Sequence, residues 1–336
     1  MIRKLFLILL YLVIPVLAAL GTVLALRHVI LSPYIPNEKG TVYFEVPENS
    51  SFSAVAKQLQ EMGIIRFDWA FKVLAKLKRK DTSIMAGEYE LSAAMAPEDI
   101  LEKMVSGKMI LRRFTVKEGA SIWEIGSLVA KAGITSRSEF DAALTDPNLL
   151  NEFGVSAASF EGYLFPETYQ FPKRTKPKKI ISAMMDQLKL NWDVEWDAKI
   201  KESGLTKHQV LTLASIVEKE SGDREEQPLI AAVFLNRLKK KMRLQADPTV
   251  IYGMTNFNGN ITKDDLLTPT PYNTYVIDAL PPGPIANPGE SAIRAVLYPA
   301  QSEALYFVAD GKGRHIFSNN LEDHNQAVRV YQKGGG

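Results

Sequence analysis

The first pattern along the chain is a long apolar run near its amino terminus. No charged residue interrupts residues 5–26. As a helix, this run would span about 33 Å, which matches a bilayer core of roughly 30 Å. The pattern therefore predicts a transmembrane helix over residues 5–26, with a short tail at 1–4 before it and a linker at 27–39 after it.

The charges that flank this run predict its orientation. Arg3 and Lys4 precede it, and Arg27 and His28 follow it closely. The positive-inside rule favours a cytoplasmic amino terminus and an exported body for such a helix. A cleaved signal peptide is the alternative, although the apolar run is longer than the roughly 7–15 residues of a usual signal core.

Residues 40–155 contain an internal repeat with an offset of 70 positions. FEVPENSSFSAVAKQLQEMGII begins at Phe44, and FTVKEGASIWEIGSLVAKAGI begins at Phe114. Each copy predicts a short strand, a turn and a helix, with Ser51 and Ser121 as the residues that cap the helices. The element order resembles LysM, a small βααβ fold that holds N-acetylglucosamine polymers. A generic strand–turn–helix unit without a binding role is the alternative.

The composition of the chain changes near residue 156, where an aromatic-rich segment begins. FEGYLFPETYQFP, at residues 160–172, is dense in aromatic residues and contains two prolines. Such a segment is not a regular helix, and it predicts a rigid, half-buried loop. Its aromatic rings suit the apolar faces of sugar rings, while packing in a core is the alternative.

Two glutamates, Glu218 and Glu220, lie in the otherwise apolar segment IVEKESG. The capping-box pattern of Thr206 and Gln209 predicts a helix that begins at Lys207. The apolar positions of this helix recur at helical spacing, at Val210, Leu213, Ala214 and Val217. Both glutamates fall on the rims of that buried stripe. The spacing leaves both as candidates for the acid of an active site, and a solvated helix edge is the alternative.

Composition excludes several classes of function. The chain has no cysteine, which excludes a disulfide framework, a thiolate nucleophile, a cysteine-held metal and a lipoprotein anchor. Its 40 Lys and Arg residues nearly balance 38 Asp and Glu residues, so we expect no nucleic-acid partner. A metal enzyme using His315, His324 and Asp247 is an alternative, but the spacing of the histidines fits no standard motif. We expect neither a metal nor a cofactor.

Long irregular stretches follow the glutamates, and they are rich in Asn, Thr, Tyr, Pro and Gly. Amide and hydroxyl side chains suit a neutral, hydroxyl-rich ligand. EGYLFPETY, LASIVEKE, NRL, DPTV-x-YG, YNTY and LPPGPIANPG occur in this order. With these motifs the chain resembles the YceG-like family of membrane-bound endolytic murein transglycosylases, up to about residue 331.

The resemblance implies an α+β protein in which an α+β catalytic domain at 156–331 follows the LysM-like region. It also implies that Glu218, and not Glu220, is the catalytic glutamate, a choice that helix geometry does not make. The implied enzyme is a lyase that cleaves the bond between N-acetylmuramic acid and N-acetylglucosamine within nascent glycan strands. It would leave 1,6-anhydro ends, with Glu218 acting first as general acid and then as base.

The implied partners are peptidoglycan glycan strands, the membrane and peptidoglycan synthases (penicillin-binding proteins). The implied location is the bacterial inner membrane, with a single transmembrane helix and a periplasmic catalytic domain. A non-catalytic peptidoglycan-binding scaffold is the alternative function.

We expect a cleft with Glu218 at its floor and nine substrate-binding side chains near it. These are Glu161, Tyr163, Glu167, Asn236, Gln245, Asp247, Tyr272, Asn273 and Asn287. Glu161 and Asp247 are the expected supporting carboxylates, since each lies in a family motif. Asp247 precedes Pro248, which favours an extended backbone. Its side chain could therefore cap a turn instead of meeting substrate.

Overall fold

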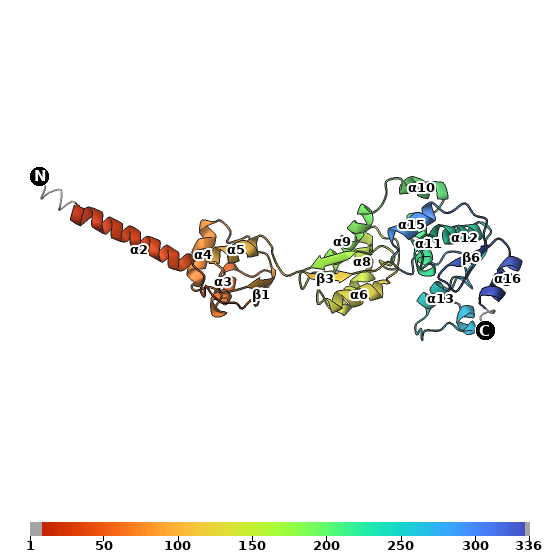
Figure 1. Ribbon diagram of the computed structural model, residues 1–336, viewed down its shortest axis with the longest axis horizontal. Coiled ribbons are helices and arrows are strands. Elements are labelled where there is room, and N and C mark those ends of the chain that lie inside the picture. The colour runs from red at the N-terminus through yellow and green to blue at the C-terminus, as the bar shows by residue number, and fades with distance from the viewer. Residues whose placement is uncertain (1–8, 333–336) are drawn as a thin grey trace. The chain divides into compact units, whose positions relative to one another are not determined.

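The computed structural model describes residues 9–332. The described chain divides into two compact units between Arg112 and Arg113, and Figure 1 shows their helices and strands. One hydrophobic core lies in the first unit, and two lie in the second.

The first unit begins with an exposed apolar helix. A π-helical turn, η1 (Leu9–Val13), leads into α2 (Ile14–Leu31). Together they are long and apolar enough to cross a membrane, a test that a signal sequence also passes. The helix continues into the predicted linker because residues 27–31 contain no Gly or Pro, and it ends before Ser32 and Pro33. The expected tail at 1–4 and the start of the expected helix lie outside the described residues.

The rest of the first unit is a small α+β fold around one core. Its elements are β1 (Val42–Val46), α3 (Phe52–Glu61), α4 (Asp68–Leu77), β2 (Gly87–Leu91) and α5 (Pro97–Val105). β1 pairs antiparallel with β2, which places Phe44 opposite Tyr89. Both rings are buried between the strands and the helices.

The second unit begins with the second copy of the repeat. Its elements are β3 (Arg112–Thr115), α6 (Ile122–Lys131), α7 (Arg137–Leu144), α8 (Pro147–Glu152), β4 (Thr168–Phe171) and α9 (Pro177–Leu190). β3 pairs with β4. The expected helix caps are confirmed, because the Ser51 and Ser121 hydroxyls accept hydrogen bonds from the backbone of α3 and α6.

The division of the structure differs from the expected boundary at 155 and 156. Phe114 and Phe140, which precede that boundary, share a core with Phe160 and Ile181, which follow it. The pairing of β3 with β4 also crosses it. The second copy of the repeat therefore belongs to the second unit, and the first unit ends near Arg112.

The remaining elements build a helical core and a hairpin. They are α10 (Trp196–Ser203), α11 (Lys207–Glu220), α12 (Gln227–Lys239), α13 (Asp247–Gly253), α14 (Lys263–Leu267), α15 (Glu290–Leu297), β5 (Tyr306–Ala309), β6 (His315–Ser318) and α16 (Leu321–Tyr331). α11 packs against α12, α13 and α15. The Thr206–Gln209 capping box is present, so α11 begins where the sequence predicts. Every residue from 210 to 217 is buried. α11 is therefore a central helix that is covered on all sides, and not a surface helix with a single buried stripe.

Candidate active site

Glu218 lies in the last turn of the buried helix α11. Its side chain is half-buried, and Oε2 accepts a hydrogen bond of 3.0 Å from the backbone N–H of Gly289. This is the only hydrogen bond of the carboxylate among the residues that the structure describes. One carboxyl oxygen is therefore held by the protein, while Oε1 is available for a ligand.

Two glycines allow the backbone to approach this carboxylate. Gly119 has a φ of +74°, and a Cβ atom there would lie 3.4 Å from Cγ of Glu218. Its carbonyl accepts a hydrogen bond of 3.3 Å from Nζ of Lys219. A Cβ atom at Gly289 would lie 2.2 Å from Oε1 of Glu118. The turn before α6 and the loop before α15 thus meet at the end of α11.

The burial of Glu218 favours its protonated form. Burial raises the pKa of Glu218, and the N–H of Gly289 partly offsets this effect. The Glu118 carboxylate raises the pKa further, whereas Arg224 and Lys219 lower it. A carboxyl group whose pKa is raised in this way can hold a proton closer to neutral pH, as a general acid must.

Glu220 lies on the other side of the same helical turn. It is half-buried, and burial raises its pKa to about 7, with a further increase from Asp247 and an opposing effect of Arg237. Oδ1 of Asp247 accepts a hydrogen bond of 2.6 Å from the hydroxyl of Tyr275. Both glutamates of the motif therefore have raised pKa values, and these shifts do not choose between them.

Glu161 is a buried carboxyl group that joins three segments of the second unit. It is 2% exposed, and Ile122, the first residue of α6, donates its N–H to both oxygens at 3.1 and 3.2 Å. The Asn287 amide donates to Oε1 at 2.9 Å, and the Tyr252 hydroxyl donates to Oε2 at 3.1 Å. Burial raises the pKa of Glu161 to about 8. Glu161 therefore contacts protein groups on every side.

Asn287 connects Glu161 to the loop whose Gly289 contacts Glu218. Its side chain is fully buried, donates to the carbonyl of Ala120 at 2.9 Å and accepts from the N–H of Leu164 at 2.9 Å. Its backbone pairs with Ala120, and its carbonyl accepts the N–H of Gly119. Gly289, two residues further, donates to Glu218. Glu161 and Asn287 thus fix the segments on both sides of Glu218.

Tyrosines and a histidine extend the network along the 282–289 loop. The Tyr163 hydroxyl lies 2.8 Å from Nδ1 of His208, whose Nε2 lies 2.8 Å from the carbonyl of Pro282. The rings of Tyr252 and Tyr272 pack at 4.8 Å. Tyr163, Tyr272 and Asn287, three of the expected site residues, therefore belong to one connected region with Glu161.

Other expected site residues make local contacts within the second unit. Asn236 donates to the carbonyls of Ser302 and Ala304, and the buried Asn273 donates to carbonyls at the end of α14. Glu167 accepts the N–H of Thr168 at the start of β4. The Asn236 and Asn273 amides and the Glu167 carboxylate thus hold the backbone locally. Exposed Gln245 lies on the segment that leads to Asp247.

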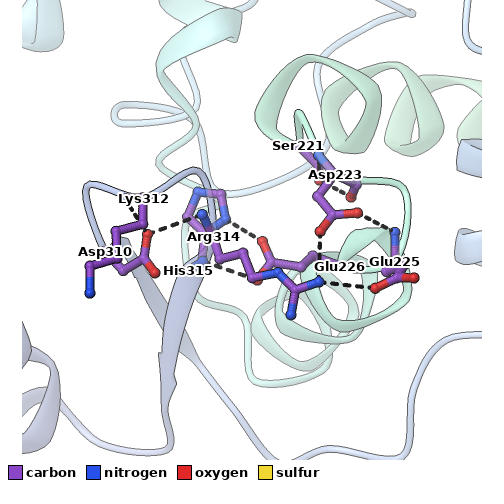
Figure 2. A network of polar contacts seen from close by, with 8 residues as sticks. All are labelled: Ser221, Asp223, Glu225, Glu226, Asp310, Lys312, Arg314 and His315. Atoms are coloured by element: carbon purple, nitrogen blue, oxygen red, sulfur yellow. Dashed lines mark hydrogen bonds and ion pairs between the residues drawn. The ribbon is translucent and has the colours of Figure 1, made fainter.

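A polar network fixes the loop that follows α11. Figure 2 shows this loop opposite the β5–β6 hairpin, with Ser221, Asp223, Glu225 and Glu226 on one side and Asp310, Lys312, Arg314 and His315 on the other. Nδ1 of His315 lies 2.8 Å from Oε2 of Glu226, and the His315 N–H donates to Oε1 at 3.0 Å. Arg314 pairs with Asp223 and Glu225 at 3.3 and 3.0 Å.

The described residues contain no group of three or more His, Asp or Glu side chains that could hold a metal ion. His315 bonds to Glu226, and Asp247 bonds to Tyr275. His324 stacks on Tyr306 at 5.2 Å. The side chains of the metal alternative thus have separate partners in the structure.

Sequence reasoning missed four residues of this region. Glu118 and Gly289 lie in motifs that the sequence makes visible, EGAS and LPPGPIANPG, but nothing in the spacing indicates that they touch. Tyr252 lies in DPTV-x-YG. His208 has no motif of its own, and only the folded chain reveals its contact with Tyr163.

Comparison with known proteins assigns the chain to a family. The model of the YceG-like family matches residues 44–330. The chain belongs to the YceG-like family. The match covers nearly all of the described chain that follows α2, including both copies of the repeat and all of the α11 region.

Two relatives of this chain share one name, and a solved structure shares its fold. A Bacillus subtilis protein named endolytic murein transglycosylase is 36% identical, over 90% of this chain and 88% of its own length. A Streptococcus pneumoniae protein of the same name is 32% identical, over 95% of this chain and 64% of its own length. The crystal structure of a YceG-like protein from Listeria monocytogenes aligns with a TM-score of 0.59 at 33% identity, over 86% of this chain and 99% of that one.

Proposed function

We propose that this chain is an endolytic lytic transglycosylase of peptidoglycan. It would cleave the bond between N-acetylmuramic acid and N-acetylglucosamine within nascent strands and leave 1,6-anhydro ends. The names of its YceG-like relatives support the class of reaction. The observation that carries the chemistry is the half-buried Glu218 carboxyl, which has a raised pKa and accepts a hydrogen bond from Gly289.

One carboxyl group suffices for this reaction because the nucleophile belongs to the substrate. Glu218 protonates the leaving oxygen of N-acetylglucosamine, and the C6 hydroxyl of the muramic acid attacks its own anomeric carbon. Glu218 then accepts the hydroxyl proton, so no water is consumed. The intramolecular attack gains from proximity. A hydrolase, by contrast, usually needs a second carboxyl group to activate water or attack.

Two matched variants test the role of Glu218. Glu218→Gln preserves the shape and removes the titrating proton, so we expect the cleavage rate to fall about 10²–10⁴-fold. Glu220→Gln makes the same change on the other side of the turn, and we expect a smaller effect. If Glu220→Gln abolishes cleavage and Glu218→Gln does not, the catalytic role passes to Glu220.

Mass spectrometry of the products tests the type of reaction. Purified glycan strands digested by the full-length protein should carry 1,6-anhydro ends at internal cleavage positions. Reducing ends would contradict a lyase and indicate a hydrolase. Product strands of intermediate length, and not only disaccharides, would support endolytic cleavage.

We also propose that α2 stays in the membrane as an anchor in the bacterial inner membrane. Its length and apolar composition support a single span. The flanking charges favour an amino terminus in the cytoplasm and a catalytic unit in the periplasm. An anchor would raise the local concentration of enzyme where synthases release new strands. Resistance of the cellular protein to alkaline extraction tests this, since a cleaved signal would release the body.

A non-catalytic role in glycan binding is the second candidate. The strand–helix–helix–strand order of the first unit, with β1 antiparallel to β2, is the observation that favours it. Binding of the full-length Glu218→Gln variant to purified sacculi would support a glycan-binding first unit. Full cleavage activity in the wild type would still show that binding is not the whole function.

A further inference from the structure

Helix α4 exposes an apolar face outside the core of the first unit. Phe67, Trp69, Val73 and Leu77 are 39%, 50%, 50% and 78% exposed, and we call these four residues the α4 face. The last three recur every four residues, which puts them in one row along the helix. The opposite side of α4 packs in the core through Ala70, Phe71, Leu74 and Ala75. An exposed apolar row of this kind indicates an interaction surface.

One residue of the α4 face, Phe67, lies next to the end of α2. Ile30 and Leu31 line the same small cavity as Phe67 and Phe71, and Figure 1 shows α4 beside the end of α2. Leu31 packs against the core of the unit. The N–H of Ile35 donates to the carbonyl of Ala93 at 3.0 Å. These contacts attach the end of α2 to the folded unit.

The length of α2 predicts how far from the bilayer core the contact between α2 and α4 lies. The apolar run ends at Leu26, and α2 continues to Leu31. Five further residues of helix rise about 7.5 Å, close to the thickness of the headgroup layer on one side of a bilayer. Ile30 and Leu31 would then lie at headgroup level, together with Phe67 of the α4 face, which lines the same cavity.

The composition of this region suits a phospholipid surface. Trp69 lies beside Phe67 at 5.9 Å, and Tyr34 lies beneath the guanidinium of Arg66 at 5.7 Å. Tryptophan and tyrosine are enriched at membrane interfaces. Residues 66–80 contain six Lys and Arg residues and one acidic residue.

Part of this positive charge faces solvent. Lys78 and Lys80 pair with Glu98 and Glu102 of α5. Lys76 and Arg79 are exposed, and neither has an ion-pair partner in the described part of the chain. Basic residues beside an apolar row are typical of helices that lie on anionic membranes.

We propose that the α4 face docks on the headgroup layer of the bilayer that α2 spans, with Lys76 and Arg79 next to anionic phospholipids. The inference rests on the proposed anchoring role of α2. Docking would hold the first unit in one orientation on the membrane, because the unit is attached both through α2 and through the α4 face.

The absence of cysteine makes a labelling experiment direct. Val73→Cys is introduced into the full-length protein, labelled with an environment-sensitive fluorophore and reconstituted in phosphatidylglycerol-containing vesicles. A fraction of the lipids carries a quencher near the headgroup. Val194→Cys is the matched control, because it makes the same substitution at a site that is 91% exposed in the second unit.

We expect blue-shifted, lipid-quenched emission at position 73 and neither effect at position 194. Lys76→Glu combined with Arg79→Glu should reduce the quenching at position 73, and more so in vesicles rich in anionic lipid. Both residues are exposed, so these changes leave the core intact.

Other outcomes would overturn the inference. Aqueous, unquenched emission at position 73 in a protein that resists alkaline extraction would leave the anchor in place and exclude docking. A blue shift without lipid quenching would mean that a protein, such as a second copy of this chain, covers the face. Loss of the protein on extraction would contradict the anchor, and with it the docking.

Discussion

Gly289 lies so close to Glu118 that a Cβ atom at position 289 would stand 2.2 Å from Oε1 of the glutamate. The same residue donates its backbone N–H to Glu218. Gly289 therefore separates two carboxylates, holding one by a hydrogen bond and leaving room for the other. Its φ is ordinary, so the requirement for glycine comes from space and not from backbone conformation.

Gly289→Ala should displace the Glu118 side chain and leave the loop in place. The Glu118 side chain is 31% exposed and can rotate toward solvent. Its charge would then move away from Glu218, and the pKa of Glu218 would fall. We expect the alkaline limb of the pH–rate profile to move to lower pH, because the general acid loses its proton earlier. The free energy of unfolding should change by less than about 1 kcal/mol, below the usual cost of overpacking a rigid core.

Gly222→Ala is the control for this variant. A Cβ atom at Gly222 meets nothing within 4 Å, although the residue lies just after α11. We expect the pH–rate profile of Gly222→Ala to equal that of the wild type. A large loss of stability in Gly289→Ala without a shift of the profile would show that the loop moves instead of Glu118.

Glu118 and Arg224 should shift the same profile in opposite directions. Glu118 raises the pKa of Glu218, and Arg224, which pairs with Glu118, lowers it. Glu118→Gln should move the alkaline limb to lower pH, and Arg224→Gln should move it to higher pH. Salt should weaken both effects, since Arg224 is 68% exposed. Shifts in the same direction would mean that the variants act through structure and not through charge.

Sequence patterns predicted the local elements of this fold well. Ser51 and Ser121 cap their helices, and α11 begins at Lys207, because a cap depends on residues within one helical turn. The repeat predicted the strand and first helix of each copy for the same reason. Membership of the YceG-like family was also predicted and is confirmed.

Contacts between distant segments could not be predicted in the same way. Nothing near Glu118 in the sequence indicates Gly289, and nothing near Phe114 indicates that it shares a core with Ile181. The two compact units divide at another place than the expected domain boundary for this reason, since the pairing of β3 with β4 joins the two sides of that boundary. Asn273 stays a predicted substrate residue, and the sequence does not indicate that its amide holds the end of α14.

Glu161 should make the stability of the second unit depend on pH. Its pKa is about 8 in the folded protein and near the ordinary value of 4.5 in the unfolded chain. Between these values the folded state binds a proton that the unfolded state has released, so stability falls as pH rises from about 4.5 to 8. Glu161→Gln cannot titrate, and its unfolding free energy should change less over this range. Denaturant unfolding at pH 5, 6, 7 and 8 measures the difference in slope.

Glu161→Ala should be much more damaging than Glu161→Gln. The alanine leaves the N–H of Ile122 and the amide of Asn287 without their acceptor, in a site that is closed to water. Each buried unpaired group costs about 1–3 kcal/mol. The glutamine can accept from both groups and donate to the hydroxyl of Tyr252. Equal losses of stability in the two variants would contradict this account of the network.

His315 and Arg314 offer a test of the network that follows α11, because neighbouring residues bind the same loop in different environments (Figure 2). The His315 and Glu226 side chains are 15% and 10% exposed, whereas the Arg314 side chain is 61% exposed. His315→Ala removes the partner of a largely buried carboxylate oxygen and should cost about 1.5–3 kcal/mol. Arg314→Ala removes solvent-screened pairs and should cost about 0–1 kcal/mol.

The cleavage rates of His315→Ala and Arg314→Ala should fall in the same order as their stabilities. The 221–226 loop begins directly after the turn that carries Glu218, so loosening it should reduce the cleavage rate in His315→Ala more than in Arg314→Ala. Thermal unfolding and glycan cleavage, both measured on the full-length protein, compare the two variants. Equal losses of stability and of cleavage rate in the two variants would contradict this account. They would mean that the exposed ion pairs of Arg314 with Asp223 and Glu225 hold the loop as firmly as the buried His315–Glu226 contact does.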